Sequence, residues 1–343
     1  MVENMKAAVL REFKTPLRLE EVEEIKGLTR DEVLLKIDMT GVCYRDILTV
    51  DGYFPKTRLP IILGHEICGR VVDVGEDVVE FKKGDRVASL TYIPCGECIE
   101  CRREEENICR RRLWFGEDIN GSYAEYLKTS HRSLVRASED LSSEAIAISA
   151  CVTGMLIHAL KTKGKLTQDE RILITGATGG VGVHAIQIAK SYGADVIAVT
   201  GREQYVDRLY KLGADYVIVS RNGAYSNEVK SITGGVGVDI VLECVGLSLI
   251  ESLKSVRWGG RIIQVGNIKP EPIPLMLGHF ILKEVSLHGS LSCTRKELAE
   301  ALELHRSGRV KPITIVLPLE HVEEAHRMIR ERKHFGRIML KVT

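Results

Sequence analysis

Four cysteines lie within fifteen residues of one another, in a charged segment of the first third of the chain. They follow the spacing C-x-x-C-x-x-C-x7-C, at Cys95, Cys98, Cys101 and Cys109. Four thiolates at this spacing can close a tetrahedral zinc site that leaves no position open for a substrate. We therefore predict a structural zinc site in a lobe at about residues 94–112. The alternatives are a lobe that folds without metal and one that holds a disulfide.

A second group of residues able to bind a metal is dispersed along the chain. It consists of Cys43, the pair His65 and Glu66 in "LGHEICG", and Cys151 in "SACVTGM". Each of these also has an ordinary interpretation, because buried cysteines are common and a His-Glu pair can be a hydrogen-bonded dyad of the core. Their spacing alone does not decide between a catalytic metal centre and separate core residues.

A glycine-rich turn stands between an apolar segment, "RILIT", and a helix-forming segment, "VHAIQIAK". Glycines at this place let backbone N–H groups approach a pyrophosphate at a helix N-terminus, where the helix dipole favours negative charge. Because the turn lies inside a strand–turn–helix unit, it predicts dinucleotide binding rather than a merely structural turn. The predicted cradle consists of Gly176, Ala177, Thr178, Gly179, Gly180, Val181 and Gly182.

The end of the next predicted strand, "DVIAVT", indicates which dinucleotide is bound. An NAD-specific site usually has an Asp or Glu there to hold the ribose 2′-OH, but this strand ends at Thr200 and is followed by Gly201 and Arg202. A hydroxyl, an open backbone and a guanidinium suit a 2′-phosphate, and Tyr205 is placed to stack or hydrogen-bond nearby. We therefore expect NADP(H). The alternative is that Arg202 is a solvated surface charge and that NAD is also accepted.

The order of the predicted elements indicates an α/β protein with two domains. Short β-rich segments such as "EVLLKIDMT" and "ICGRVVDVGE" dominate the first part, and strands alternate with helices from about Arg171. Such alternation predicts a doubly wound parallel sheet. From about Val285 the chain returns to short strands and one amphipathic helix, "RKELAEALELHRSG". The chain is thus expected to leave its first domain, build the parallel sheet and return.

Composition excludes several other functions. The 48 Lys and Arg against 47 Asp and Glu give a net charge of +1, so neither nucleic acid nor an anionic membrane is an expected partner. The first residues lack a signal-peptide apolar region, and we expect no apolar run of the roughly 18–20 residues that a membrane span needs. Nine cysteines, four of them clustered, fit reduced thiols and a cytoplasmic protein. Abundant Glu, Lys and Arg with scarce Asn and Gln fit a thermostable protein or ordinary drift.

Over nearly its whole length the sequence resembles the zinc-containing alcohol dehydrogenases of the medium-chain dehydrogenase/reductase superfamily. The resemblance is carried by "LGHEICGRVVDVGEDVVEFKKGDRV", the four-cysteine lobe, "GSYAEY", "GATGGVG" and "RWGGRIIQVGN". It implies a GroES-like, β-rich catalytic domain built from both chain ends, residues 1–148 and 286–343. A Rossmann domain at 149–285 lies between them, and the active site is in the cleft.

By motif position, the resemblance implies a catalytic zinc held by Cys43, His65 and Cys151, with Glu66 as a carboxylate that can serve as a fourth ligand. Asp46 matches the carboxylate that orients the ligating histidine. The implied reaction is NADP(H)-dependent hydride transfer between nicotinamide C4 and a zinc-polarised carbonyl carbon of a small alcohol, ketone or aldehyde.

The resemblance also implies contacts outside the ligand set. Val245, Gly266 and Asn267 are expected to contact the cofactor. Trp114 matches an aromatic position that often walls the substrate pocket, and it is equally well interpreted as a core tryptophan under the zinc lobe. Prokaryotic members with the four-cysteine lobe are often homotetramers joined through sheet edges, so "VSLHGS" is a candidate interface strand.

The sequence departs from the alcohol dehydrogenase pattern beside the first zinc cysteine. The family generally has a Ser or Thr two residues after it, and many members have a His three further on, to pass the substrate proton outward. Here these positions are Arg45 and Leu48, which have no group that can both accept and donate a proton at neutral pH.

The same stretch, "YRD", resembles the related quinone and enoyl-thioester reductases, and "CYRDILTVDGYFP" resembles archaeal acryloyl-CoA reductase-type members. Tyr44 is then a candidate proton donor or substrate contact, or else a packing tyrosine. Three functions stay open: a zinc- and NADPH-dependent carbonyl reductase, an NADPH-dependent reductase of an activated C=C bond, and a non-catalytic NADPH-binding protein.

Overall fold

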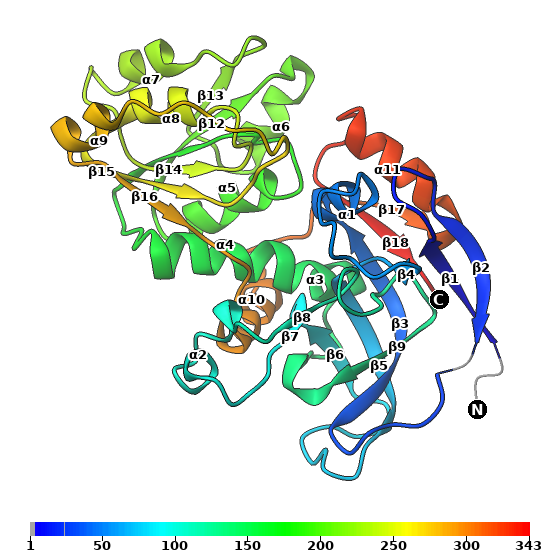
Figure 1. Ribbon diagram of the computed structural model, residues 1–343. Helices are drawn as coiled ribbons and strands as arrows, with labels where there is room; N and C mark the ends of the chain where they lie inside the picture. Colours follow the sequence, from blue (N-terminus) through cyan, green and yellow to red (C-terminus); the bar gives the residue numbers. More distant parts are fainter. Residues whose placement is uncertain (1–3, 24) are drawn as a thin grey trace. The chain divides into compact units, whose positions relative to one another are not determined.

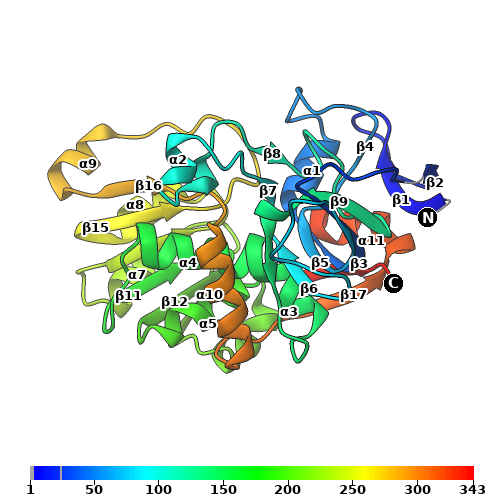
Figure 2. The same cartoon turned by 90° about the horizontal axis from the view of Figure 1, so that it is seen from below.

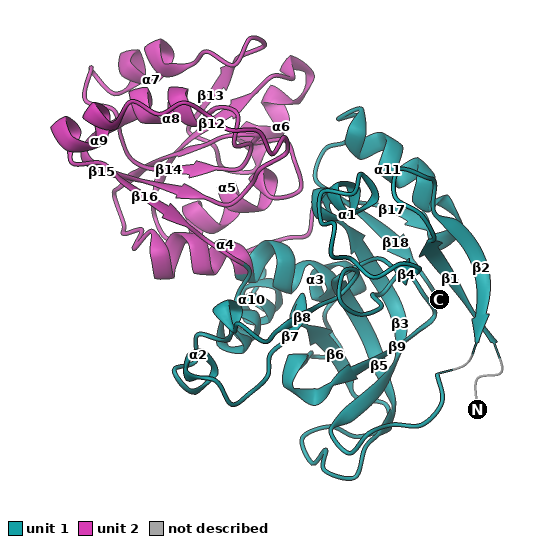
Figure 3. Ribbon diagram, viewed as in Figure 1, with its two compact units in different colours: residues 1–154, 292–308, 314–343 teal, residues 155–291, 309–313 magenta. Residues whose placement is uncertain are grey.

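The computed structural model describes residues 4–23 and 25–343, and these form two compact units (Figure 3). Unit 1 contains Met1–Gly154, Ser292–Gly308 and Thr314–Thr343, and unit 2 contains Met155–Leu291 and Arg309–Ile313. The predicted catalytic domain begins at residue 1, so its first three residues and residue 24 lie outside the described part. Unit 1 ends its first segment six residues later than the expected boundary at 148, which places Cys151 in unit 1.

Unit 1 is built on a largely antiparallel sheet with the order β10-β6-β5-β3-β18-β17, and β9 pairs with β3 (Figure 1). A second sheet has the order β2-β1-β4, and β7 pairs with β8. Only β17 and β18 pair in parallel among these described strands. The strands are β1 (Asn4–Leu10), β2 (Arg18–Glu23), β3 (Glu32–Val42), β4 (Ile61–Ile62), β5 (Glu66–Val74), β6 (Arg86–Ser89), β7 (Tyr92–Ile93), β8 (Leu113–Trp114), β9 (Tyr126–Ser130), β10 (Leu134–Arg136), β17 (Thr314–Pro318) and β18 (Arg337–Lys341).

Alternation along β3 shows why this sheet forms. Val33, Leu35 and Ile37 are fully buried, and the residues between them are more exposed, which is the two-residue period of a strand with one face in a core. The helical elements of unit 1 are α1 (Tyr44–Val50), α2 (Ile99–Arg102), η1 (Glu106–Ile108), η2 (His131–Ser133), α3 (Ser143–Ile148), η3 (Ser149–Gly154), α10 (Arg295–Arg306), η6 (Leu319–His321) and α11 (Val322–Arg330).

Unit 2 contains a six-stranded parallel sheet with the order β13-β12-β11-β14-β15-β16, and Figure 2 shows β16 at one edge beside β15. This confirms the predicted Rossmann fold. Helices cover the sheet because its strands are apolar on both faces. The elements are α4 (Met155–Ile157), η4 (His158–Lys163), β11 (Arg171–Ile174), α5 (Gly182–Ser191), β12 (Asp195–Thr200), η5 (Glu203–Tyr205), α6 (Val206–Lys211), β13 (Tyr216–Val219), α7 (Ser226–Ile232), β14 (Val238–Glu243), α8 (Leu249–Ser255), β15 (Val256–Gln264), α9 (Leu277–Lys283) and β16 (Ser286–Gly289).

One helical stretch, Ser143–Lys163, is long and apolar enough to cross a membrane by length and composition. The expectation that the chain has no such run is therefore wrong. However, 83% of the most apolar window of this stretch is buried within the protein, as in the core helix of a globular protein. Its middle part, η3, is a π-helical segment, a local feature that often occurs at functional sites.

Candidate functional site

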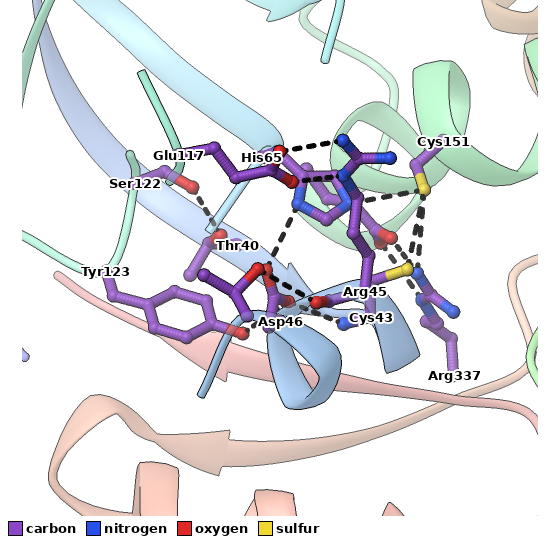
Figure 4. A network of polar contacts seen from close by, with 12 residues as sticks. Thr40, Cys43, Arg45, Asp46, His65, Glu117, Ser122, Tyr123, Cys151 and Arg337 are labelled. Carbon is purple, nitrogen blue, oxygen red and sulfur yellow. Dashed lines mark hydrogen bonds and ion pairs between the residues drawn. The ribbon is translucent and has the colours of Figure 1, made fainter. Parts of the chain in front are cut away.

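The dispersed cysteine, histidine and glutamate side chains of unit 1 meet at one place (Figure 4). One ligand atom from each of Cys43, His65, Glu66 and Cys151 lies within 4.8 Å of the others. Cys43 Sγ is 3.9 Å from Cys151 Sγ, and Cys151 Sγ is 3.5 Å from His65 Nε2. The fold thus brings together residues that are more than one hundred positions apart in the sequence.

Three of the four candidate ligands lie where an element begins, and the fourth, Cys151, lies inside a helical segment. Cys43 follows β3 and is the N-cap of α1, whose third residue, Asp46, accepts a hydrogen bond from the Cys43 backbone N–H at 2.8 Å. His65 immediately precedes β5, and Glu66 is the first residue of that strand. Cys151 lies in the π-helical segment η3.

The spacing of these atoms fits a tetrahedral metal ion. Sulfur at about 2.3 Å and nitrogen at about 2.0–2.1 Å from a zinc ion would lie about 3.8 Å apart for two sulfurs and about 3.5 Å apart for sulfur and nitrogen. The two separations in the structure, 3.9 Å between the sulfurs and 3.5 Å between sulfur and nitrogen, agree with these edges. Two thiols, an imidazole and a carboxylate are also a donor set that zinc prefers.

Asp46 holds the imidazole of His65 in one tautomer. Its carboxylate accepts hydrogen bonds from His65 Nδ1 at 3.1 Å and from the Tyr123 hydroxyl at 2.9 Å, so Nε2 is left toward Cys151. Burial lowers the pKa of His65, but the charge and hydrogen bond of Asp46 outweigh burial and raise that pKa to about 10. A metal ion at Nε2 must therefore displace a proton, which makes metal binding pH-dependent.

The two cysteines of this cluster have pKa values that are shifted in opposite directions. The hydrogen bond from Cys151 lowers the pKa of Cys43 well below its ordinary value against the opposing effect of burial, and the charge of Arg337 adds to the lowering. The same bond, together with burial, raises the pKa of Cys151. Cys43 is thus the more readily ionised thiol of the pair and the first thiolate available to a metal ion.

Glu66 is fully buried and is paired with Arg337 of β18, a residue that the sequence analysis did not single out. Arg337 Nε donates to Glu66 Oε2 at 3.1 Å, and Nη2 donates both to Glu66 Oε1 and to Cys151 Sγ, the latter at 3.7 Å. Gly41 makes room for this carboxylate, because a Cβ at that position would stand 1.9 Å from Glu66 Oε2. Nothing in the local pattern of "HFGRIML" signals this pairing, since its partner is 271 residues away.

Arg45, which replaces the expected hydroxyl residue, is engaged by Glu117. Its Nε donates to Glu117 Oε1 at 2.5 Å and its Nη2 to Oε2 at 2.9 Å, and the side chains are 30% and 11% exposed. The guanidinium carbon lies 4.5 Å from the ring centroid of Trp114 and 4.7 Å from that of Phe54. Figure 4 shows the pair beside His65 and Cys151.

Trp114, the predicted pocket residue, is held in place by its neighbours. It lies in β8, its ring is edge-on to Tyr92 at 5.4 Å, and Arg112 stacks over it at 4.7 Å. Because Arg45 contacts the same ring, Trp114 stands next to the first turn of α1, directly after Cys43.

The four cysteines of the predicted lobe form a second cluster, with all four sulfurs within 4.8 Å of one another. Cys98 Sγ is 3.4 Å from Cys101 Sγ and 3.6 Å from Cys109 Sγ, and Cys95 Sγ is 3.9 Å from Cys101 Sγ. These separations exceed the roughly 2.05 Å of a disulfide and fit the edges of a zinc tetrahedron. Burial raises the pKa of Cys95, but backbone N–H groups of Glu97 and Cys98 outweigh it and lower that pKa to about 6. The pKa values of Cys98 and Cys101 are raised, that of Cys101 chiefly by burial, so Cys95 is the thiol that ionises most readily among these three.

The predicted phosphate cradle joins β11 to α5 in unit 2. Gly176 has a φ of +59°, a conformation that a side chain would strain, and the Gly179 N–H donates to its carbonyl at 2.9 Å. The remaining residues of the turn, Ala177, Thr178, Gly180 and Val181, lead into the helix, which begins at Gly182. A glycine-rich turn that leads from a strand into the N-terminus of a ten-residue helix is the arrangement that binds pyrophosphate.

The residues predicted to select the cofactor lie together at the end of β12. Arg202 Nη2 donates to Thr178 Oγ1, and the Arg202 backbone N–H donates to Thr200 Oγ1 at 3.1 Å. Gly201 is exposed between them, and the Arg202 guanidinium lies 5.2 Å from the ring centroid of Tyr205. The structure thus assembles hydroxyls, a guanidinium and an aromatic ring where an acidic side chain would select NAD.

The other expected cofactor residues lie at the ends of β14 and β15. Val245 packs against Gly176, and Asn267 lies beside Gly246. The Gly266 N–H donates to the carbonyl of Glu243 at 3.2 Å. All three expected residues therefore lie on loops at the same edge of the sheet as the cradle.

Comparison with known proteins decides the family. Residues 29–139 match the model of the alcohol dehydrogenase GroES-like domain, and residues 180–307 match that of the zinc-binding dehydrogenase. The chain is 40% identical to an acryloyl-coenzyme A reductase of Sulfurisphaera tokodaii over 340 residues, which are 98% of this chain and 100% of the relative. It belongs to the alcohol dehydrogenase family of medium-chain dehydrogenases/reductases.

Other members of this family are similarly close. An alcohol dehydrogenase of Geobacillus stearothermophilus is 36% identical over 98% of this chain and 100% of its own length. The crystal structure of AibC superposes with a TM-score of 0.92 at 39% identity, covering 99% of this chain and 96% of that one. The protein is thus a family oxidoreductase whose relatives carry names of two different activities.

The departures from the alcohol dehydrogenase pattern occupy defined places in the structure. The Tyr44 ring packs, half-buried, against a core cluster that includes Ile47, Leu319 and Val322, which favours packing over proton donation. Leu48 is half-buried on α1 and offers no polar atom. The hydroxyl relay of the alcohol dehydrogenases therefore has no counterpart at positions 45 and 48.

Three residues of the site escaped sequence reasoning. Tyr123, in the quoted motif "GSYAEY", supports Asp46, and its place in that motif was a usable signal. Glu117 and Arg337 gave no signal, because each was one charged residue among many in the chain. Their partners became evident only when the fold brought them to Arg45 and Glu66.

Proposed function

We propose that the protein is an NADPH-dependent, zinc-dependent reductase of the activated C=C bond of an α,β-unsaturated thioester such as acryloyl-CoA. The net reaction converts the enoyl thioester, NADPH and a proton into the saturated thioester and NADP⁺. The observation that carries this proposal is the Arg45–Glu117 ion pair at the position of the alcohol proton relay. The 40% identity to an acryloyl-coenzyme A reductase over the whole chain supports it.

The physical argument concerns where the proton goes. Alcohol oxidation must remove a proton from the substrate oxygen, and a guanidinium bonded to a carboxylate cannot accept one. Reduction of an activated C=C bond adds hydride at one carbon and a proton at the other, so it does not need a hydroxyl at position 45. Arg45 fixed by Glu117 is therefore compatible with thioester reduction and unsuited to alcohol oxidation.

The residues present fit both cofactors. Cys43, His65 and Cys151, with Glu66 close by, would hold the catalytic zinc, and the four-cysteine lobe would hold a structural zinc. When bound, zinc supplies a Lewis acid for the substrate carbonyl oxygen, and the nicotinamide supplies the hydride. Asp46 orients His65 for this task, and Arg337 holds Glu66 and donates to Cys151.

We propose NADPH rather than NADH as the cofactor because of the polar residues at the end of β12. Thr178, Thr200 and Arg202 form one hydrogen-bonded group, and a guanidinium there pairs with a 2′-phosphate more strongly than with a ribose hydroxyl. Direct binding measurements with both reduced cofactors test this choice.

Carbonyl reduction is the second candidate, and the complete zinc ligand set favours it. The same Lewis acid that activates a thioester activates a ketone or aldehyde. A screen of metal-loaded protein with NADPH separates the two: saturated thioester from acryloyl-CoA supports the first candidate, and alcohol formed only from aryl, cyclic or aliphatic carbonyls supports the second. NADPH binding without turnover of either class would leave a non-catalytic binding protein.

We also propose assembly into a homotetramer through the exposed edge of the unit 2 sheet. Strand β16, within "VSLHGS", is exposed along its length, and the helix before it leaves Leu277, Ile281 and Leu282 more than 70% exposed. Large apolar side chains gathered beside an unpaired strand edge suit pairing with a second copy. Sedimentation of the protein with and without Ile281→Glu tests this assembly.

A further inference from the structure

Glu243, the last residue of β14, is a buried carboxylate at the loop edge of the unit 2 sheet. Its strand is paired with β11, which leads into the phosphate cradle, and its side chain is completely buried. The carboxylate accepts hydrogen bonds from Thr175 Oγ1 (3.0 Å), the N–H groups of Val245 and Gly246 (both 2.9 Å), Ser248 Oγ (2.8 and 2.9 Å) and Ser252 Oγ (2.6 Å).

These bonds join three loops. Thr175 immediately precedes Gly176 of the cradle, and its Oγ1 also accepts the Cys244 N–H at 2.9 Å. Val245, which Glu243 holds by its backbone N–H, packs its side chain against Gly176. The main-chain oxygen of Glu243 accepts the Val265 and Gly266 N–H groups at 3.0 and 3.2 Å. One residue thus ties the loops that follow β11, β14 and β15.

The two carboxylate oxygens have partly different donors. Oε1 accepts from the fixed backbone N–H groups of Val245 and Gly246 and from the hydroxyls of Thr175 and Ser248. Oε2 accepts from the hydroxyls of Ser248 and Ser252, which can rotate and become acceptors. All of these donors are neutral. An amide can therefore replace the carboxylate, with its oxygen toward the backbone and its NH₂ toward the serines, whereas an apolar side chain cannot.

We infer that Glu243 is a positioning residue for the dinucleotide, because it fixes the phosphate cradle relative to the loop of Val245 and Gly246. In doubly wound sheets the dinucleotide binds outside the carboxyl ends of the strands, at the point where strand order reverses, which here lies between β11 and β14. Loops that must meet one ligand bind it more tightly when they are fixed beforehand. This inference rests on the nicotinamide-cofactor part of the proposed function.

Glu251 offers a matched control in the same unit. Its carboxylate also accepts two backbone N–H groups, those of Tyr225 and Ser226, each at 3.0 Å, and it receives Lys254 Nζ at 2.8 Å. These contacts hold α7 against α8 and involve none of the predicted cofactor residues. A variant that lacks the Glu251 hydrogen bonds therefore shows how far a general destabilisation of unit 2 affects NADPH binding, because it removes no contact of the cradle.

The test is calorimetric binding of NADPH to the full-length protein and to Glu243→Leu, Glu243→Gln and Glu251→Leu. We expect Glu243→Leu to raise the dissociation constant about tenfold or more, and the other two to stay within about threefold of the wild type. Only Glu243→Leu leaves Thr175 and the N–H groups of Val245 and Gly246 without their acceptor. At saturating NADPH, kcat of Glu243→Leu should stay within about threefold of the wild type, since a positioning defect is overcome by mass action.

An unchanged dissociation constant for NADPH in Glu243→Leu would overturn the inference, and so would an equal increase in Glu251→Leu. If Glu243→Gln bound NADPH as weakly as Glu243→Leu, the charge of Glu243 rather than its positioning of the loops would matter, which would also overturn the inference. If Glu243→Leu does not fold, Thr175→Val removes the bond from Thr175 Oγ1 to Glu243 and the bond that this oxygen accepts from the Cys244 N–H, and an unchanged dissociation constant there would equally refute the inference. A wild-type protein that binds NADPH but reduces no thioester would refute the proposed activity and leave this test intact.

Discussion

Arg45 and Glu117 form a two-pronged ion pair beside the candidate zinc ligands, with the guanidinium against the ring of Trp114. The pair occupies the place where an alcohol dehydrogenase of this family is expected to have its relay hydroxyl. The pair leaves no hydroxyl at position 45 to carry the proton of an alcohol. The Arg45 guanidinium also packs against the ring of Trp114 and so holds β8 beside α1. This pairing is why we propose that the site reduces an activated double bond.

Restoring a relay should restore alcohol oxidation. Arg45→Ser alone would leave Glu117 part-buried and unpaired, so the variant to make is Arg45→Ser with Glu117→Gln and Leu48→His. We expect alcohol oxidation to rise about tenfold or more over the wild type, since general acid–base groups contribute typically about 10²–10⁴-fold. The measurement is NADP⁺ reduction with a panel of primary and secondary alcohols.

The control for this relay is Arg45→Ser with Glu117→Gln, which lacks the histidine. It should gain less than the triple variant. An unchanged rate in the triple variant would show that the alcohol proton leaves by another route, and position 45 would then say nothing about the reaction.

The buried pair of Glu66 and Arg337 should be needed for stability. Arg337→Met leaves a fully buried carboxylate without its cation, and breaking such a pair costs about 3–5 kcal/mol of the free energy of unfolding. Glu66→Gln combined with Arg337→Met should recover part of this loss, because no buried charge is then left unpaired. Denaturant unfolding of wild type, both single variants and the double variant gives the coupling, and additive losses would contradict it.

The two cysteine clusters should bind one zinc ion each, independently of one another. Protein purified without chelator should contain two zinc ions per chain, and Cys43→Ser and Cys98→Ser should each lower the count to one. Cys43→Ser should abolish activity with little loss of stability, whereas Cys98→Ser should lower the free energy of unfolding, since a structural zinc contributes directly to folding. Metal analysis beside thermal unfolding checks both effects, and two zinc ions retained in either variant would show that its cysteine is no ligand.

Arg202 should select the cofactor. Arg202→Ala should weaken NADPH binding by about 10- to 100-fold and leave NADH binding nearly unchanged, because a charged hydrogen bond contributes about 1.5–3 kcal/mol. Arg208 lies 5.7 Å from the same Tyr205 ring, so Arg208→Ala is a matched control that should leave the ratio unchanged. Equal loss of both cofactors in Arg202→Ala would contradict the role of a 2′-phosphate contact.

The fold could be predicted from the sequence because its signals are local. The alternation of β3 and the strand–glycine turn–helix order from Arg171 to Ser191 each lie within one short window, and both elements formed as expected. The four-cysteine cluster could also be predicted, because all of its members lie within one short segment at the spacing of a zinc site. For these three local signals, sequence and structure agree.

What the sequence could not provide were pairings between distant segments. Arg337 meets Glu66 across 271 residues, and Arg45 meets Glu117 across 72. Neither residue type nor spacing distinguishes these charges from the many solvated ones. The apolar run of Ser143–Lys163 is a local signal that the sequence analysis missed, whereas its burial in a core became evident only in the structure.

The central claim is tested most directly by incubating zinc-loaded protein with NADPH and acryloyl-CoA and identifying the product by mass spectrometry. The account predicts propionyl-CoA, formed in equal amount to the NADPH consumed, with the aldehydes and ketones of a parallel panel consumed far more slowly. Untouched acryloyl-CoA beside rapid conversion of a ketone or aldehyde to its alcohol would contradict it.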